Sequence, residues 1–105
     1  GIYAIGDSTA VPIAGGKNLP KAGVFAHYQG EVVAKNIIQE LEGKAPSHRY
    51  DGRGWCAIET GNGRAAFGSG NFYAEPAARV QLYKPSVLWH LGKVAFEQWW
   101  LRRWL

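Results

Sequence analysis

The spacing of apolar residues along the chain predicts two helices. Across residues 21–42 the apolar side chains recur at steps of three and four, which places them on one face of a helix. Pro20 suits the start of this helix and Gly43 suits its end, because proline fits a first turn and glycine accepts the left-handed conformation that often follows a last one. Residues 86–104 form the second predicted helix, with Ser86 as its N-cap.

Short runs of apolar and β-branched residues predict the strands. Residues 2–5 read as a short buried strand that a Gly-Asp pair closes, and residues 8–20 read as a loop. The strands predicted after the first helix are Gly54–Thr60, Arg64–Gly68, Asn71–Tyr73 and Val80–Tyr83. Glycine-rich turns at 61–63 and 68–70 separate the first three, so we expect an antiparallel hairpin or meander. The predicted fold class is α+β, with a long helix, a small antiparallel sheet and a C-terminal amphipathic helix.

Charge and tryptophan are spread unevenly over the 105 residues. The net charge of +4 arises wholly in residues 46–105, and four of the five tryptophans lie in the last 17 residues. A basic, Trp-rich second half suits an anionic membrane or an acidic partner, whereas its basic residues are too scattered for us to expect a nucleic-acid partner. The single cysteine rules out an intrachain disulfide and a Cys/His zinc set, and we expect no metal site.

The segment that closes the first predicted strand carries the candidate chemistry. Gly6 permits close approach to the backbone, and Asp7 presents a carboxylate at the strand's C-terminal edge, where ligands of open α/β sheets bind. A helix begins shortly afterwards, and its first N–H groups carry partial positive charge that stabilises an anion. Gly23, in the first turn, leaves the backbone open to a ligand. The alternative for Asp7 is a simple turn aspartate.

At this point the sequence resembles the FAD-dependent pyridine nucleotide-disulfide oxidoreductases. The run YAIGD followed by PKAGVFA is similar to the last FAD-binding segment of these flavoproteins, which have two dinucleotide-binding domains. Residues 50–63 (YDGRGWCAIETGNG) resemble the segment with the C-terminal redox cysteine of the sulfide:quinone oxidoreductase group. Residues 85–101 (PSVLWHLGKVAFEQWWL) are similar to that group's C-terminal amphipathic tail. Flavocytochrome c sulfide dehydrogenases and type II NADH dehydrogenases are near relatives of the group.

The resemblance implies that the chain is the C-terminal part of a FAD enzyme. Residues 1–45 would be the last segment of the FAD domain, and residues 46–105 a C-terminal domain with a hairpin sheet and a Trp-rich amphipathic helix. The residues that match the cofactor-binding segment are Gly6, Asp7, Lys21, Gly23, Val24 and Phe25. Asp7 would lie near the ribityl chain and pyrophosphate. Lys21 would balance flavin charge, or it is simply a surface lysine of the first turn. By itself the chain is expected to be inactive and to hold FAD weakly, because it lacks the GxGxxG fingerprint.

Cys56 is the candidate catalytic residue. Taken alone, a cysteine between two apolar strand residues is most simply a small, inert core residue. The resemblance instead matches Cys56 to the cysteine that faces the flavin and forms a disulfide or persulfide with a second cysteine. Sulfide attacks that disulfide, and the released thiolate passes electrons to the flavin. The second cysteine would lie in the N-terminal remainder of the parent chain.

The C-terminal helix is the candidate membrane contact. Its apolar arc is too wide for one core face, and tryptophan with terminal arginine is typical of an interfacial helix. The resemblance implies a peripheral, monotopic membrane protein on the cytoplasmic side of a prokaryotic membrane, where residues 86–105 meet the membrane surface and its quinone. Glu59 and His90 are candidates for proton transfer to that quinone, although exposed hairpin and helix charges are the commoner case.

Three functions remain open at this stage. The first is an oxidoreductase that passes electrons from sulfide through a cysteine pair and FAD to a membrane quinone. The second is an NAD(P)H-dependent flavoprotein of the type II NADH dehydrogenase kind. The third, for the isolated chain, is a non-catalytic module that binds a membrane or forms a homodimer, since exposed strand edges invite self-association.

Overall fold

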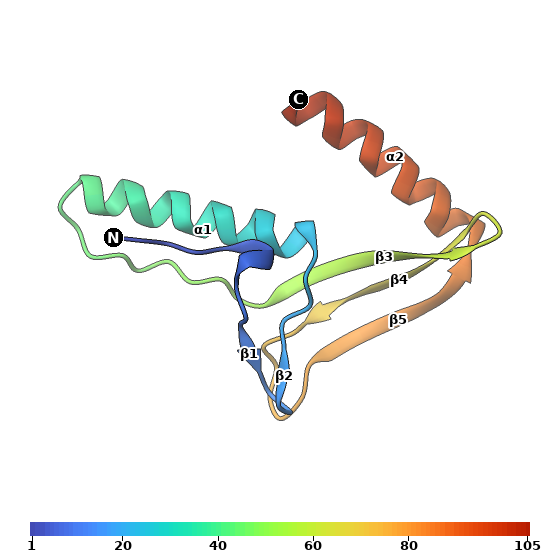
Figure 1. The fold of residues 1–105 in the computed structure, drawn as a ribbon, viewed down its shortest axis with the longest axis horizontal. Helices are drawn as coiled ribbons and strands as arrows, with labels where there is room; N and C mark the ends of the chain where they lie inside the picture. The colour runs from blue at the N-terminus through green and yellow to red at the C-terminus, as the bar shows by residue number, and fades with distance from the viewer. The chain divides into compact units, whose positions relative to one another are not determined.

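A computed structural model describes all 105 residues and divides them into two compact units. The first unit comprises residues 1–54 and 70–79, and the second comprises residues 55–69 and 80–105. The helices and strands are β1 (Pro12–Ile13), β2 (Lys17–Asn18), α1 (Gly23–Leu41), β3 (Arg53–Gly61), β4 (Arg64–Asn71), β5 (Arg79–Ser86) and α2 (Val87–Trp104). Two helices and two small antiparallel sheets make the chain α+β, as predicted (Figure 1).

Helix α1 of the first unit confirms the predicted helix to within two residues at each end. It ends in a Schellman motif, in which the Lys44 N–H donates to the Gln39 carbonyl at 2.8 Å and the Gly43 N–H donates to the Glu40 carbonyl at 3.0 Å. Gly43 has a φ of +72°, which glycine adopts without a Cβ clash. Gly43 therefore ends the helix for the predicted reason, because it accepts the left-handed conformation that follows the last turn.

The strand predicted at residues 2–5 is wrong. These residues are extended but pair with no strand, and they run along α1 in the opposite direction (Figure 1). The Tyr3 hydroxyl donates to Glu40 at 3.0 Å, and Ile5 lies 3.6 Å from the place where a Cβ on Gly30 would be. Without a neighbouring strand the backbone has no ladder to join, and much of the apolar surface of this segment is exposed rather than buried.

The predicted loop at residues 8–20 contains a small hairpin. In it, β1 pairs with β2 in antiparallel fashion. Gly15 and Gly16 turn the chain with positive φ angles of 81° and 70°. Each strand has only two residues, too few for the alternation that identifies a strand in a sequence. Leu19 follows the hairpin and, at 8% exposure, belongs to the core of the first unit.

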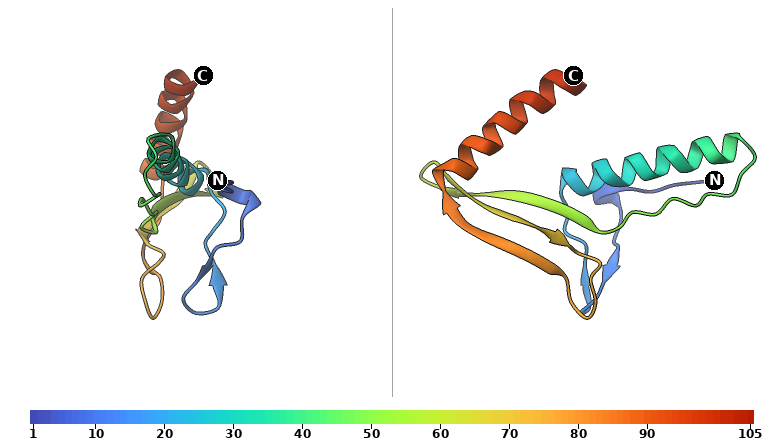
Figure 2. Two further views of the ribbon diagram at one scale, coloured as in Figure 1. Left: turned by 90° about the vertical axis from the view of Figure 1, so that its left-hand side faces the viewer. Right: turned by 180° about the vertical axis from the view of Figure 1, so that it is seen from behind.

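The three longer strands form one sheet in the order β3-β4-β5 (Figure 2). The predicted hairpin between β3 and β4 is confirmed. Its turn contains Gly61, Asn62 and Gly63, whose φ angles of 89°, 53° and 64° suit glycine and asparagine. The last predicted strand is also present, as the core of the longer β5.

The turn predicted at 68–70 and the separate strand predicted at 71–73 are wrong, because β4 continues without a break to Asn71. Gly68 is a buried strand residue rather than a turn residue. A Cβ on Gly68 would lie 2.8 Å from a methyl group of Leu82 on β5. This glycine therefore makes room for a neighbouring side chain, a use of strand glycine that the sequence does not distinguish from a turn.

Phe25 is the centre of the first unit's core. Only 2% of its surface is exposed, and its ring meets the Phe72 ring edge to face at a centroid distance of 4.9 Å. A Cβ on Gly54 would overlap the Phe25 ring, so glycine is required there. Asn36 is also buried and holds the segment after α1, since its side chain donates to the His48 carbonyl at 3.0 Å and accepts from the His48 N–H at 2.9 Å.

Helix α2 of the second unit confirms the predicted C-terminal helix. The Ser86 hydroxyl accepts a hydrogen bond from the Trp89 N–H at 3.3 Å, as expected of an N-cap. None of the side chains of α2 is fully buried. The structure has no helix that combines the length and the apolar character needed to cross a membrane.

Candidate functional site

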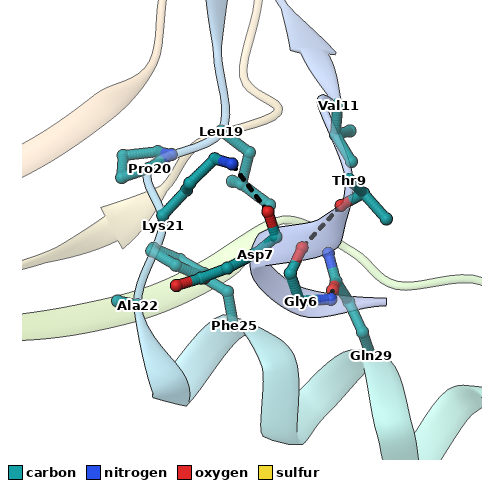
Figure 3. Close-up of a pocket in the computed structure, with 10 residues that line it drawn as sticks. All are labelled: Gly6, Asp7, Thr9, Val11, Leu19, Pro20, Lys21, Ala22, Phe25 and Gln29. Atoms are coloured by element: carbon teal, nitrogen blue, oxygen red, sulfur yellow. Dashed lines mark hydrogen bonds between the residues drawn. The ribbon is translucent and has the colours of Figure 1, made fainter. Parts of the chain in front are cut away.

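The Gly-Asp turn and the start of α1 enclose a small hollow in the first unit (Figure 3). Four of the six predicted cofactor residues line it, namely Gly6, Asp7, Lys21 and Phe25. The other two, Gly23 and Val24, begin α1 and lie outside the lining. Residues that are far apart in the sequence are thus gathered at the N-terminal end of one helix.

The turn at Gly6 is fixed by hydrogen bonds to its backbone. The Gly6 N–H donates to Oε1 of Gln29 on α1 at 2.8 Å, and the Thr9 hydroxyl donates to the Gly6 carbonyl at 2.8 Å (Figure 3). Gly6 has a φ of +67°, and a Cβ there would lie only 3.2 Å from Cβ of Ala26. Gln29 is a positioning residue that the sequence analysis missed, because no local pattern links it to a turn 23 residues earlier.

Lys21 holds its ammonium group against the same turn. Its Nζ donates to the backbone carbonyl of Asp7 at 2.6 Å (Figure 3). The Asp7 residue itself is exposed. A cation, a carboxylate and a helix N-terminus therefore lie at this end of the first unit. The cation and the helix N-terminus can stabilise an anionic ligand, and the carboxylate can accept hydrogen bonds from hydroxyl groups.

The hollow is too small to enclose a flavin. Its volume of about 10 Å³ holds roughly one water molecule. At the start of α1, outside the hollow, a Cβ on Gly23 would meet no atom within 4 Å, so the backbone there is open. The exposed Asp7 and the open backbone at Gly23 fit one edge of a flavin site. The remaining walls are not supplied by these residues.

Cys56 lies on β3 within the second unit. It is a half-buried free thiol, and its Sγ lies 3.8 Å from the Ala57 carbonyl. Successive side chains of a strand point to opposite faces, so Cys56 faces the side of the sheet opposite to Trp55 and Ala57. No second cysteine is present in the sequence to pair with it.

A larger cavity of about 350 Å³ lies in the second unit between the β3–β4 hairpin and α2. We call it the aromatic groove. Its lining is Trp55 and Ala57 on β3, Phe67 and Ser69 on β4, and Trp89, Gly92, Lys93 and Phe96 on α2. Its volume falls within the range of about 300–1,000 Å³ that is usual for small-molecule sites.

Half of the residues that line the groove are aromatic. The Phe67 and Trp89 rings stack at a centroid distance of 4.5 Å and an angle of 10°. Trp55 meets Phe96 edge to face at 4.9 Å and lies 5.8 Å from Phe67. Flat ring faces and ring edges of this kind bind a planar apolar ligand through stacking and edge-to-face contacts.

The sequence analysis missed the aromatic groove, although both of its halves leave a signal. Trp55 and Ala57 are two residues apart, as are Phe67 and Ser69, so each pair lies on one face of its strand. The helical lining starts at Trp89 and follows steps of three, four and seven, which defines one stripe of α2. What the sequence does not show is that the strand face and the helix stripe face one another.

Three ionisable side chains form a cluster next to the groove, which we call the charged cluster: Glu59, His90 and Lys93. Nδ1 of His90 lies 3.1 Å from both carboxylate oxygens of Glu59. Nζ of Lys93 lies 3.1 Å from Oε1 of the same carboxylate. The hydrogen bonds from His90 and then from Lys93 hold the pKa of the Glu59 carboxyl below its ordinary value. The structure thus brings together the two residues singled out for proton transfer and adds a third.

Helix α2 leaves a large apolar surface exposed. The exposed apolar side chains of α2, together with Leu105 after its end, are Val87, Leu88, Leu91, Val94, Trp99, Leu101, Trp104 and Leu105. In the last turn, the guanidinium of Arg103 lies over the rings of Trp99 and Trp104, 5.6 Å and 5.4 Å from their centroids. A contiguous exposed apolar surface is a feature that interaction sites share, so α2 is a candidate contact surface.

Comparison of the chain with protein families, with characterised proteins and with solved structures gave no match. The small hollow, the thiol and the aromatic groove are three separate features, of which the groove has the best-defined ligand chemistry.

Proposed function

We propose that the chain is the C-terminal part of an FAD-dependent oxidoreductase of the sulfide:quinone oxidoreductase kind. The enzyme would pass electrons from sulfide through a cysteine pair and FAD to a membrane quinone. The observation that carries this proposal is the aromatic groove, whose rings and volume suit a quinone head group. The groove also lies against the helix whose sequence resembles the tail of that enzyme group.

The aromatic groove offers a quinone both kinds of contact that it needs. The ring of the quinone would lie among Trp55, Phe67 and Phe96, where stacking and edge-to-face contacts stabilise a flat apolar group. A carbonyl oxygen of the quinone would accept a hydrogen bond from Lys93, which lines the groove. The apolar tail would leave along α2, whose exposed apolar side chains suit the membrane interface.

The first unit would contribute one edge of the FAD site. When bound, FAD supplies the two-electron carrier between donor and quinone. The carboxylate of Asp7 would accept hydrogen bonds from ribityl hydroxyls, and the start of α1 at Gly23 would stabilise negative charge on the ring. Gln29 and Lys21 would keep the Gly-Asp turn in place for these contacts.

Cys56 would form a disulfide with a cysteine elsewhere in the parent protein. Hydrosulfide attacks one sulfur of that disulfide and forms a persulfide, and the other sulfur leaves as a thiolate. A half-buried free cysteine on a strand suits this role, because the reaction needs both access for sulfide and protection from water.

The test of the redox assignment is Cys56→Ser in the complete protein that carries this chain. We expect reduction of FAD by sulfide to be lost, while binding of a quinone in the aromatic groove is retained. Thr60→Ser, a change on β3 outside the groove lining that leaves the thiol intact, is the control. If sulfide reduced the flavin of the serine variant at the normal rate, the cysteine mechanism would be wrong. Reduction by NADH in place of sulfide would favour the NADH dehydrogenase alternative.

Membrane binding is a second candidate function, favoured by the exposed apolar side chains of α2. We expect the full chain to sediment with vesicles of phosphatidylcholine and phosphatidylglycerol. Replacing Leu88 and Trp104, which are 78% and 54% exposed, by serine should release it into the supernatant. Equal sedimentation of the wild type and this double variant would remove the membrane assignment.

A further inference from the structure

The lining of the aromatic groove combines rings with small residues. Each of its three elements supplies a small residue, Ala57 from β3, Ser69 from β4 and Gly92 from α2. On α2, Gly92 lies between Trp89 and Phe96 at steps of three and four residues, so it leaves a gap between two rings on one face of the helix. A Cβ at Gly92 would meet no atom within 4 Å. The cavity therefore owes part of its space to the small residues that lie between its rings.

The Phe67 ring is nearly parallel to two other rings around this space. The planes of Phe67 and Trp89 differ by 10°, and those of Trp55 and Phe67 by 28°. The Phe96 ring is turned by 84° from Trp55. A flat ligand can therefore stack on the nearly parallel rings and meet Phe96 edge to face. A second aromatic ring in the ligand adds to these contacts, because each aromatic pair contributes binding energy beyond the area that it buries.

The groove offers few polar groups to the oxygen atoms of a ligand. Apart from the indole N–H groups, Ser69 and Lys93 are the lining residues with a polar side-chain group. The Lys93 ammonium is held by Glu59, with Nζ 3.1 Å from Oε1. A naphthoquinone has two carbonyl oxygens on a fused carbon skeleton, whereas a dimethoxybenzoquinone brings two ether oxygens as well. Each oxygen that leaves water without gaining a hydrogen-bond donor lowers the affinity.

We propose that the aromatic groove selects a quinone with two fused rings, a naphthoquinone, over a dimethoxybenzoquinone, and that Gly92 sets this preference. The proposed function makes a quinone the ligand, and the selectivity rests on it. One carbonyl oxygen of the quinone accepts a hydrogen bond from Lys93, and the second ring occupies the gap between Trp89 and Phe96. Gly92 is the specificity-determining residue, because any side chain at this position would take up the space of the second ring.

The test uses the full 105-residue chain with ¹⁵N-labelled indoles and two probes without an apolar tail. One probe is a naphthoquinone and the other a dimethoxybenzoquinone, each with methyl groups on its two remaining quinone-ring carbons. The probes have equal numbers of non-hydrogen atoms, and neither has an unsubstituted ring carbon to which the Cys56 thiol could add. We expect the naphthoquinone to shift the indole signals of Trp55 and Trp89 with a Kd about 10-fold lower than that of the benzoquinone, because its second ring adds aromatic contacts.

Gly92→Leu tests the residue to which the preference is assigned. A leucine side chain would fill the gap, so the Kd of the naphthoquinone should rise by at least about 10-fold and the preference should vanish. Gly92→Ala adds only a methyl group and should raise this Kd by a smaller factor. Ala95→Leu, the same kind of change at an exposed position of α2 outside the groove lining, is the control and should keep the wild-type preference. Far-UV circular dichroism of each variant checks that α2 forms.

The outcomes separate the selectivity from the function on which it rests. If both probes shift the indole signals of Trp55 and Trp89 with the same Kd, or if the benzoquinone binds more tightly, the selectivity is wrong and the quinone site stands. If neither probe shifts these signals, the proposed function fails and the selectivity fails with it. A preference that is unchanged in Gly92→Leu, or that is lost equally in Ala95→Leu, overturns the role of Gly92.

Discussion

The two units of the chain use their aromatic residues in opposite ways. In the first unit, Phe25 is 2% exposed and fills a core that leaves no room for a Cβ at Gly54. In the second unit, the rings of Trp55, Phe67 and Phe96 are only half-buried and surround a cavity of about 350 Å³. Close packing stabilises a fold. A cavity lined by rings lacks some of those packing contacts, and a bound ligand can supply them. This difference is the reason why we propose the binding function for the second unit.

The largest expected effect comes from truncating the packed ring. Phe25→Ala should lower the free energy of unfolding by about 3–5 kcal/mol, because it leaves a cavity in a closed core. Phe96→Ala removes a ring from an open groove that solvent can enter, and should cost less than half as much. Urea denaturation of both variants measures the contrast. Equal losses would mean that the groove is packed as tightly as the core.

Glycine substitutions give the next contrast. Gly54→Ala should destabilise the fold by about 1–3 kcal/mol, because its methyl group overlaps the Phe25 ring. Gly92→Ala should stabilise it by up to about 1 kcal/mol, since α2 gains helix propensity and the new Cβ meets no atom within 4 Å. Gly92 lines the groove, so the same variant should weaken quinone binding. Thermal unfolding of the two variants checks the opposite signs.

Gly30→Ala is a milder change in the first unit. A Cβ at this helical position would lie 3.6 Å from Ile5, an ordinary contact distance. We expect stabilisation of about 0.5–1 kcal/mol from helix propensity alone. Destabilisation in a thermal melt would show that residues 1–5 pack against α1 more tightly than these distances indicate.

The smallest expected effect is the pH dependence that Glu59 confers on the second unit. Its carboxyl has a lowered pKa in the folded state, so its ion pairs stabilise the fold above its ordinary value of 4.5. That contribution is lost as the pH falls through the lowered pKa. Glu59→Gln should therefore melt slightly below the wild type at pH 7 and together with it in strong acid. A difference that persists in strong acid would point to packing rather than charge.

The sequence predicts the parts of the fold that local signals determine. Helix α1, the cap at Ser86 and the hairpin at Asn62 each follow from residues close together in the chain. The errors arise where a distant neighbour decides the conformation. Position 68 needs a glycine because a Cβ there would be too close to Leu82 on another strand, and residues 2–5 have no strand to pair with.

The candidate site was also predicted only in part: the sequence identifies several of its residues but not the contacts between distant segments. The sequence identifies Asp7 and Lys21, and the structure brings them to one hollow; it also identifies Glu59 and His90, and the structure joins them. Gln29 and the groove itself were not predicted, because each depends on contacts between segments that no local pattern connects. A cavity is created by packing between segments that are distant in the sequence, and hydrophobic periodicity describes only one segment at a time.

The most direct test of the central claim is quinone binding at the aromatic groove. The five indole N–H signals of the full chain, labelled with ¹⁵N, report on separate places when decylubiquinone is titrated. We expect Trp55 and Trp89, which line the groove, to shift in a saturable manner, and Phe96→Ala to weaken that binding by at least 10-fold, about 1.4 kcal/mol. Trp104, outside the groove, should respond far less. Equal shifts at all five indoles, or unaltered binding by Phe96→Ala, would contradict the account.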